Sequence, residues 1–215
     1  MRLATVKKNG AEVAAVVTKA GVVPVETVNQ RFNQHWSTSL FEIIQTNQLD
    51  EMKHWYQNGG KQQLERIESD AIPADQVEYG PLYRHPRKIW GIGLNYVEHA
   101  ADLHEKAPNT EPASFMKPDT AIIGPGDTIE IPFQSDRTTA ESELGIIIGK
   151  ACKNVSEEEA QSVIAGFTTI IDMTAEDILA QNPRYLTRSK SFDTFLDGVS
   201  SESRSTSSAR LVTTC

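Results

Sequence analysis

The chain has few cysteines, no long apolar run and no basic run. Its 215 residues include only Cys152 and Cys215, which give neither a disulfide framework nor metal-ligand spacing, so we expect a cytoplasmic location. No stretch approaches the ~20 apolar residues that a membrane helix needs, and the N-terminal residues lack the apolar run of a signal peptide. The longest run of lysine or arginine is two residues and the formal net charge is −8. We therefore expect no nucleic-acid partner and no membrane partner.

Residues 1–84 have the pattern of a small α+β domain. The runs Arg2–Val6 and Glu12–Val17 are separated by a turn sequence that ends in Asn9-Gly10, which predicts a β-hairpin. After Ser39 the apolar residues recur at helical spacing. A strand pair followed by helices indicates a small N-terminal unit that packs against the part of the chain that follows.

Residues 85–198 are richer in strand patterns. Alternation predicts a strand over Thr139–Gly149, and an apolar run predicts a second over Gly166–Met173. Thr174 follows the second strand and is expected to cap a short helix. The last segment, residues 199–215, is dominated by Ser and Thr without an apolar period, and we expect a disordered tail there.

Three carboxylates stand out in the strand-rich part. Glu141 and Glu143 are two residues apart on a predicted strand, so their side chains leave the same face. That pattern is also normal for a solvent-facing strand, and spacing alone favours the solvent-facing interpretation. Asp172 interrupts an otherwise apolar strand, where a lone carboxylate is costly to bury. Three such groups would form an oxygen-rich site for Mg²⁺ or Mn²⁺, would also admit Ca²⁺, and argue against zinc.

A histidine and two lysines are further candidates. His99 lies three residues before Asp102, which places both on one helical face as an acid–imidazole dyad that could activate water. The spacing alone favours a surface histidine among acidic neighbours. Lys190 could stabilise an enolate or carboxylate beside a metal, or be solvated, and Lys117 is equally ambiguous by itself.

Five motifs occur in one order between about residues 86 and 195, and together they resemble the fumarylacetoacetate hydrolase family. They are Asn-Tyr-x-x-His at 95–99, Phe-x-Lys-Pro at 115–118, Glu-x-Glu-Leu with Ile-Gly-Lys at 141–150, Asp-x-Thr-Ala-x-Asp at 172–177 and Lys-Ser-x-Asp-Thr at 190–194.

This resemblance implies a mixed β-roll of α+β class, with the active site at its mouth and usually in a homodimer. It implies a divalent-metal site made from Glu141, Glu143 and Asp172. His99, with Asp102 where the family often has glutamate, resembles the family's water-activating dyad, and Lys190 matches its active-site lysine, so these three are the expected catalytic residues. Thr194 matches a threonine near the metal, and we expect it to bind substrate together with Lys117 and Arg188.

The resemblance also implies a reaction class. Members act on β-diketo or 2-oxo acids, so we expect a metal-dependent hydrolase or lyase that cleaves a C–C bond through a metal-stabilised enolate. Two alternatives stay open: an isomerase or decarboxylase of a hydroxymuconate-type acid within the same family, and a non-catalytic remnant.

Two positions and one segment depart from the family pattern. Glu176 stands where many members have arginine, and Leu179 where they have glutamine, which suggests a different or less acidic substrate unless Arg184 or Arg188 compensates. After Phe195 the chain lacks the closing strands of the family roll. We expect a truncated roll with exposed sheet edges.

Overall fold

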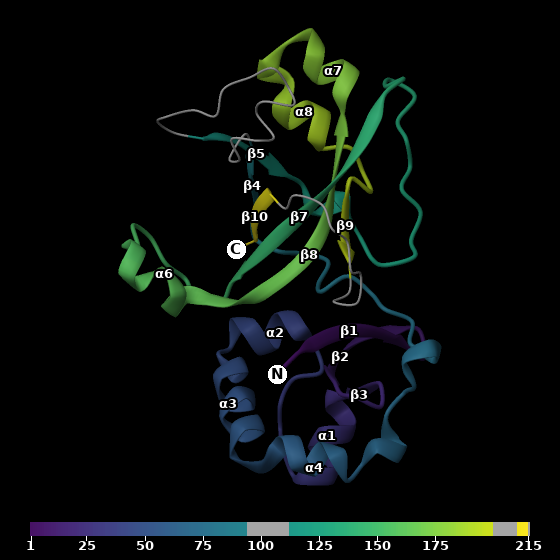
Figure 1. Cartoon of the computed structure of the whole chain (residues 1–215), viewed down its shortest axis with the longest axis vertical. Coiled ribbons are helices and arrows are strands. Elements are labelled where there is room, and N and C mark those ends of the chain that lie inside the picture. The colour runs from purple at the N-terminus through teal and green to yellow at the C-terminus, as the bar shows by residue number, and fades with distance from the viewer. Residues whose placement is uncertain (94–111, 200–209, 215) are drawn as a thin grey trace. The chain divides into compact units, whose positions relative to one another are not determined.

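The structure is a computed structural model that describes residues 1–93, 112–199 and 210–214. The chain forms two compact units, Met1–Tyr83 and Arg84–Cys215 (Figure 1). Each unit combines strands and helices. The α+β fold class predicted from the sequence is therefore confirmed.

The N-terminal unit is a three-stranded antiparallel sheet covered by short helices. The strands are β1 (Leu3–Lys8), β2 (Ala11–Val17) and β3 (Val22–Pro24), in that order across the sheet. The helical segments are α1 (Val25–Phe32), α2 (Leu40–Gln45), α3 (Gln48–Trp55), a π-helix (Tyr56–Gly60), α4 (Lys61–Glu65) and two 3-10 turns (Glu68–Asp70 and Ala74–Gln76).

Local sequence explains how this unit folds. Asn9 and Gly10 both have positive φ, 52° and 78°, which is the backbone twist that a tight hairpin turn requires, and the predicted hairpin is confirmed. The Ser39 hydroxyl accepts a hydrogen bond from the Glu42 amide and caps α2. Side chains such as Ile43 then pack with the sheet into one buried cluster.

The C-terminal unit is built on a seven-stranded mixed sheet. Its strand order is β5-β4-β10-β7-β8-β9-β6. The strands are β4 (Ile89–Gly93), β5 (Ala113–Lys117), β6 (Ile122–Ile123), β7 (Thr138–Ile148), β8 (Ile164–Ala175), β9 (Leu196–Val199) and β10 (Arg210–Thr214).

Strands β7 and β8 form the long antiparallel pair that organises this unit (Figure 1). Both were predicted, with ends a few residues from those observed. Glu141 pairs with Asp172 and Glu143 pairs with Ile170. Because directly opposed residues point to the same face, both glutamates and Asp172 share one side of the sheet.

Helices lie at both ends of this strand pair (Figure 1). α6 (Glu157–Val163) begins with a capping box in which Ser156 and Glu159 are hydrogen bonded to each other. The segments after β8 are α7 (Glu176–Gln181), a 3-10 turn (Pro183–Tyr185) and α8 (Leu186–Lys190). The predicted cap at Thr174 is wrong, because Ala175 precedes α7 without a side-chain cap and the Thr174 hydroxyl accepts a hydrogen bond from Lys190.

The predicted disordered tail is wrong for part of its length. Val199 ends β9, and Arg210–Thr214 form β10, antiparallel to β4 and parallel to β7. Strands β4 and β7 each have backbone N–H and C=O groups that need hydrogen-bond partners. A strand placed between them supplies these partners even when its sequence has no apolar period. Residues 200–209 and 215 lie outside the described part of the chain.

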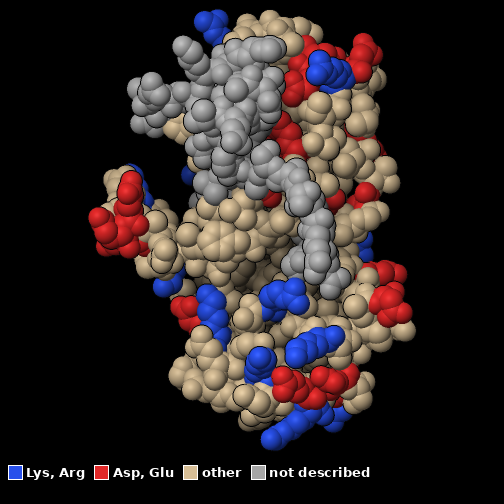
Figure 2. Space-filling view, in the orientation of Figure 1, with Lys and Arg blue, Asp and Glu red and all other residues tan. Residues whose placement is uncertain are grey.

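The surface shows charged groups in local clusters. Figure 2 shows an acidic cluster over α6, whose first turn holds Glu157, Glu158 and Glu159. Among residues 1–93, 112–199 and 210–214, no helix is long and apolar enough to cross a membrane.

Candidate active site

Glu141, Glu143 and Asp172 lie on one face of the β7–β8 pair. Glu143 is 2% exposed and Asp172 1% exposed, whereas the Glu141 side chain is 18% exposed. Because side chains alternate between the two faces along each strand, two buried carboxylates and one partly accessible carboxylate lie on the same face of the sheet. Groups of like charge in such a setting need nearby positive charge.

Lys190 supplies one of these positive charges. It ends α8, and its side chain is 3% exposed. The Nζ atom lies 2.8 Å from Asp172 Oδ2, 3.0 Å from Glu141 Oε2 and 2.6 Å from Thr174 Oγ1. It also lies 4.9 Å from the ring centroid of Phe115, within cation–π range. The three ammonium hydrogens thus match three oxygen acceptors.

Lys117 supplies the second positive charge from the end of β5. Its side chain is fully buried, and Nζ lies 2.7 Å from Asp172 Oδ1. It also donates to the backbone carbonyl oxygens of Met173, Lys190 and Phe195. Burial lowers the pKa of Lys117 to about 8, while the neighbouring Asp172 carboxylate opposes that shift.

Asp172 is the centre of this network, because each of its oxygens contacts a different ammonium group. Buried charges of this kind are costly to desolvate, and they persist only when they are paired and hydrogen bonded. Removing Asp172 would leave the buried Lys117 ammonium group without its carboxylate partner.

The donor types fit a hard divalent cation, since three carboxylates on one face are the ligands that Mg²⁺ and Mn²⁺ prefer. In this structure, however, the ammonium groups of Lys117 and Lys190 pair with Asp172, and Lys190 also pairs with Glu141. In the described part of the chain, no three Asp, Glu, His or Cys side chains are grouped so as to hold a metal ion. The Lys190 ammonium group lies between Glu141 and Asp172 instead.

The remaining predicted residues have different surroundings. Arg188 is exposed on α8, with its guanidinium 5.2 Å from the ring centroid of Tyr185. Thr194 has φ of 66°, which is unusual for a β-branched residue. Its hydroxyl accepts a hydrogen bond of 2.8 Å from the Glu130 amide. His99 and Asp102 lie outside the described residues.

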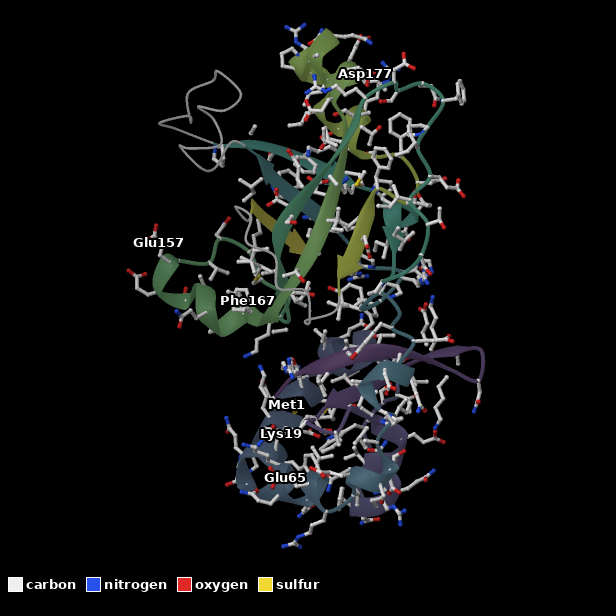
Figure 3. The ribbon with its side chains drawn as sticks, turned by 45° about the vertical axis from the view of Figure 1, so that its right-hand side comes forward. Met1, Lys19, Glu65, Glu157, Phe167 and Asp177 are labelled. Carbon is white, nitrogen blue, oxygen red and sulfur yellow. The ribbon has the colours of Figure 1, made fainter. Side chains whose placement is uncertain are left out.

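Sequence reasoning missed two contributors, Thr174 and Phe115. Thr174 is two residues beyond Asp172 on the same strand, so the period-two rule would have placed its hydroxyl beside the carboxylates. Phe115 is similarly two residues before Lys117 on β5, on the same face. Figure 3 labels Asp177 on α7, the helix that directly follows β8.

A family model described as fumarylacetoacetate (FAA) hydrolase C-terminal matches residues 88–198. That stretch contains every site residue predicted from the sequence. An uncharacterized protein of Archaeoglobus fulgidus is 46% identical over 124 residues, which are 58% of this chain and 48% of that protein. The chain spans about half the length of the curated relatives it matches.

Solved structures share the fold over most of the chain. Maleylpyruvate hydrolase from Sphingobium sp. SYK-6, in complex with manganese(II) and pyruvate, is 23% identical with a TM-score of 0.62, covering 92% of this chain and 65% of that one. A probable 2-hydroxyhepta-2,4-diene-1,7-dioate isomerase from Mycobacterium abscessus is 23% identical with a TM-score of 0.63, covering 92% and 62%. At this identity the likeness concerns the fold.

Proposed function

Because the chain belongs to the fumarylacetoacetate hydrolase family, we propose that it carries the site of a divalent-metal-dependent enzyme that cleaves a C–C bond in a small β-diketo or 2-oxo acid. The observation that supports this most directly is the convergence of Glu141, Asp172 and Lys190, three residues predicted from separate motifs. The chain spans about half the length of its curated relatives. We therefore propose the reaction for the site that these residues form.

The proposed metal ligands are Glu141, Glu143 and Asp172, with Mg²⁺ or Mn²⁺ as the cation. When bound, such a cation polarises a carbonyl oxygen of the substrate. The manganese(II) and pyruvate bound to the Sphingobium maleylpyruvate hydrolase support this choice of metal and of oxo-acid substrate. The burial of Glu143 and Asp172 keeps water from competing at their side of the site.

The other residues have distinct proposed roles. The Lys190 ammonium group would stabilise the negative charge that develops on the substrate, because it already lies among the carboxylates at the site. Lys117 contacts Asp172, three backbone carbonyl groups and the ring of Phe195, so we assign it to holding Asp172 rather than to contacting substrate. His99, oriented by Asp102, would activate water.

Two further residues complete the proposed substrate contacts. Arg188 is exposed and cationic near the site-bearing end of α8, where it can pair with a substrate carboxylate. Thr194 adjoins the buried Phe195, whose carbonyl accepts from Lys117, so it lies on the segment that closes around this lysine.

A second candidate reaction is isomerisation or decarboxylation of a hydroxymuconate-type acid. The similarity in fold to the Mycobacterium abscessus protein favours it as the alternative. The same carboxylates and Lys190 would serve, because each of these reactions develops negative charge next to a carbonyl group. Products distinguish the reactions: water addition gives two acids, decarboxylation releases CO₂, and isomerisation conserves mass.

The test is a turnover assay with Mn²⁺ and a panel of 2-oxo and β-diketo acids, read by mass spectrometry of the products. Glu143→Gln should reduce turnover by at least about 100-fold, since changes even to groups that support metal ligands cost about 10–100-fold. Glu158→Gln on the exposed start of α6 is the matched control and should retain turnover. Full activity of Glu143→Gln, or turnover that survives removal of the metal by a chelator, would contradict the proposal.

A further inference from the structure

The turn that precedes β9 has an unusual residue at its third position. The Phe195 amide donates to the Phe192 carbonyl oxygen at 3.3 Å, and Thr194 within this turn has φ of 66°. A turn with positive φ at the third position normally takes glycine there. The other non-glycine residues of positive φ in the described part of the chain are all asparagines, which tolerate that conformation. A β-branched residue at this position is strained, and such strain concentrates at functional sites.

Two hydrogen bonds hold Thr194 in this conformation. Its hydroxyl oxygen accepts from the Glu130 amide at 2.8 Å, and its own amide donates to the Thr120 carbonyl oxygen at 3.4 Å. Both partners belong to the segment between β5 and β7, and Thr120 is three residues beyond Lys117. The strained turn is therefore tied to the segment that follows Lys117.

The residue after Thr194 connects the turn to the carboxylate network. The Phe195 carbonyl oxygen accepts from Lys117 Nζ at 2.9 Å and from the Met173 amide at 3.1 Å. Met173 directly follows Asp172, and Lys117 Nζ lies 2.7 Å from Asp172 Oδ1. One carbonyl group thus contacts both the lysine that pairs with Asp172 and the backbone next to Asp172.

We propose that Thr194 is a positioning residue, whose left-handed turn holds the Phe195 carbonyl group against Lys117 and thereby fixes the orientation of Asp172. The inference deepens the proposed function and rests on it, because it concerns the same site. It adds a role through the backbone to the substrate contact proposed for Thr194.

The strain at Thr194 shows what its hydrogen bonds restrain. A β-branched residue that loses such restraints relaxes toward negative φ, where its side chain no longer clashes with the backbone. That rotation turns the peptide groups that follow, so the Phe195 carbonyl oxygen would move away from Lys117. Glycine adopts positive φ without strain and needs no restraint to keep the turn.

Three substitutions separate the turn from the hydroxyl group. Thr194→Val keeps the shape of the side chain but removes the acceptor, so the strained turn loses its restraint. Thr194→Ser keeps the hydroxyl oxygen, and Thr194→Gly removes both the hydroxyl and the strain. We therefore expect valine to disturb Lys117, and both serine and glycine to leave it in place. Thr194→Ala, which also disfavours positive φ, replaces the valine variant should that one fold poorly.

The first test measures the rate of Lys117 acetylation in the native protein by peptide mass spectrometry. Thr194→Val should raise this rate about 10-fold, since the net contribution of one hydrogen bond changes a local opening equilibrium by about that factor. Thr194→Ser and Thr194→Gly should keep the rate of the unaltered chain.

The matched control is Asn154→Val, which places valine at another left-handed residue of the same unit, in the loop before α6. It should lower the melting temperature without raising Lys117 acetylation. The proposal is overturned if Thr194→Val leaves the rate unchanged, if Asn154→Val raises it equally, or if Thr194→Gly raises it as much as Thr194→Val does.

The second test uses the turnover assay of the proposed function. Thr194→Val should lower kcat at least about 10-fold with little change in KM, because small displacements of a site lower the rate of the chemical step, and Thr194→Gly should recover kcat. A raised KM with unchanged kcat in both variants would leave only a substrate contact and overturn the positioning role. If the unaltered chain converts no acid of the panel, the proposed function fails, and the acetylation rates alone decide the role of Thr194.

Discussion

Lys117 shows at the scale of one residue why this site is held so firmly. It is a buried cation whose donors reach one carboxylate and three backbone carbonyls from segments far apart in the sequence. A group with that many partners fixes the positions of all of them. The orientation of Asp172 therefore depends on a residue 55 positions earlier in the chain.

Lys117→Met should destabilise the protein by about 3 kcal/mol, because it leaves Asp172 with one ammonium partner fewer in a buried site. Urea denaturation followed by circular dichroism measures this change. Lys88→Met replaces an exposed lysine next to β4 and should change stability by less than about 0.5 kcal/mol. Equal stability of the two variants would show that the Lys117 ion pair contributes nothing to the folded state.

At the scale of elements, β9 carries a carboxyl group in an unfavourable setting. Asp197 lies between β8 and β6, and its Oδ1 atom is buried without a hydrogen-bond partner among the described residues. Burial raises the pKa of Asp197, and nearby Asp127 adds to that rise. The native state thus favours the protonated acid more than the unfolded state does.

Asp197→Asn should raise the melting temperature at pH 7 by a few degrees and have little effect near pH 4. The sign follows from linkage: a carboxyl whose folded-state pKa is raised stabilises the fold below its unfolded pKa, and that contribution is lost as the pH rises through the folded pKa. Thermal melts of both proteins across this pH range measure the effect. Asp193→Asn, on an exposed residue, is the control and should give no such pH-dependent difference.

Many of the strands and helices could be predicted from the sequence, and physical reasons explain why the other features could not. Period-two alternation placed Glu141 and Glu143 on one face, and the apolar run around Asp172 identified the neighbouring strand. Alternation cannot give the register that sets Glu141 opposite Asp172, nor the approach of Lys190 from α8, since both depend on contacts distant in sequence. β10 was missed because its place depends on the unpaired backbone of β4 and β7 rather than on its own composition.

In the whole molecule, a row of apolar side chains crosses the face of the large sheet opposite the carboxylates. Pairing aligns Met116, Trp90, Ile146 and Phe167 across β5, β4, β7 and β8, with β10 between Trp90 and Ile146. Met116 is 44% exposed, Trp90 37% and Phe167 62%; Figure 3 labels Phe167 near the start of β8. Larger exposed apolar patches are a common feature of association surfaces, and we propose that a second copy of the chain covers this row.

Phe167→Ser should weaken dimer formation at least about 10-fold, because it removes the most exposed apolar side chain of this row. Light scattering coupled to size-exclusion chromatography, run over a range of concentrations, measures the change. Phe133→Ser is a matched control, since Phe133 is 93% exposed and lies outside the row. A monomer at all concentrations, or an equal effect of both substitutions, would contradict the prediction.

A thermal melt with and without Mn²⁺ and the oxo-acid mimic oxalate tests whether Glu141, Glu143 and Asp172 bind a divalent cation, as we propose. Ligand at about 100 times its dissociation constant should stabilise the protein by about 2.7 kcal/mol. We expect an upward shift in melting temperature for the unaltered chain and no such shift in Glu143→Gln. A cooperative melt that Mn²⁺ does not shift, or a shift of equal size in Glu143→Gln, would contradict the proposed cation binding.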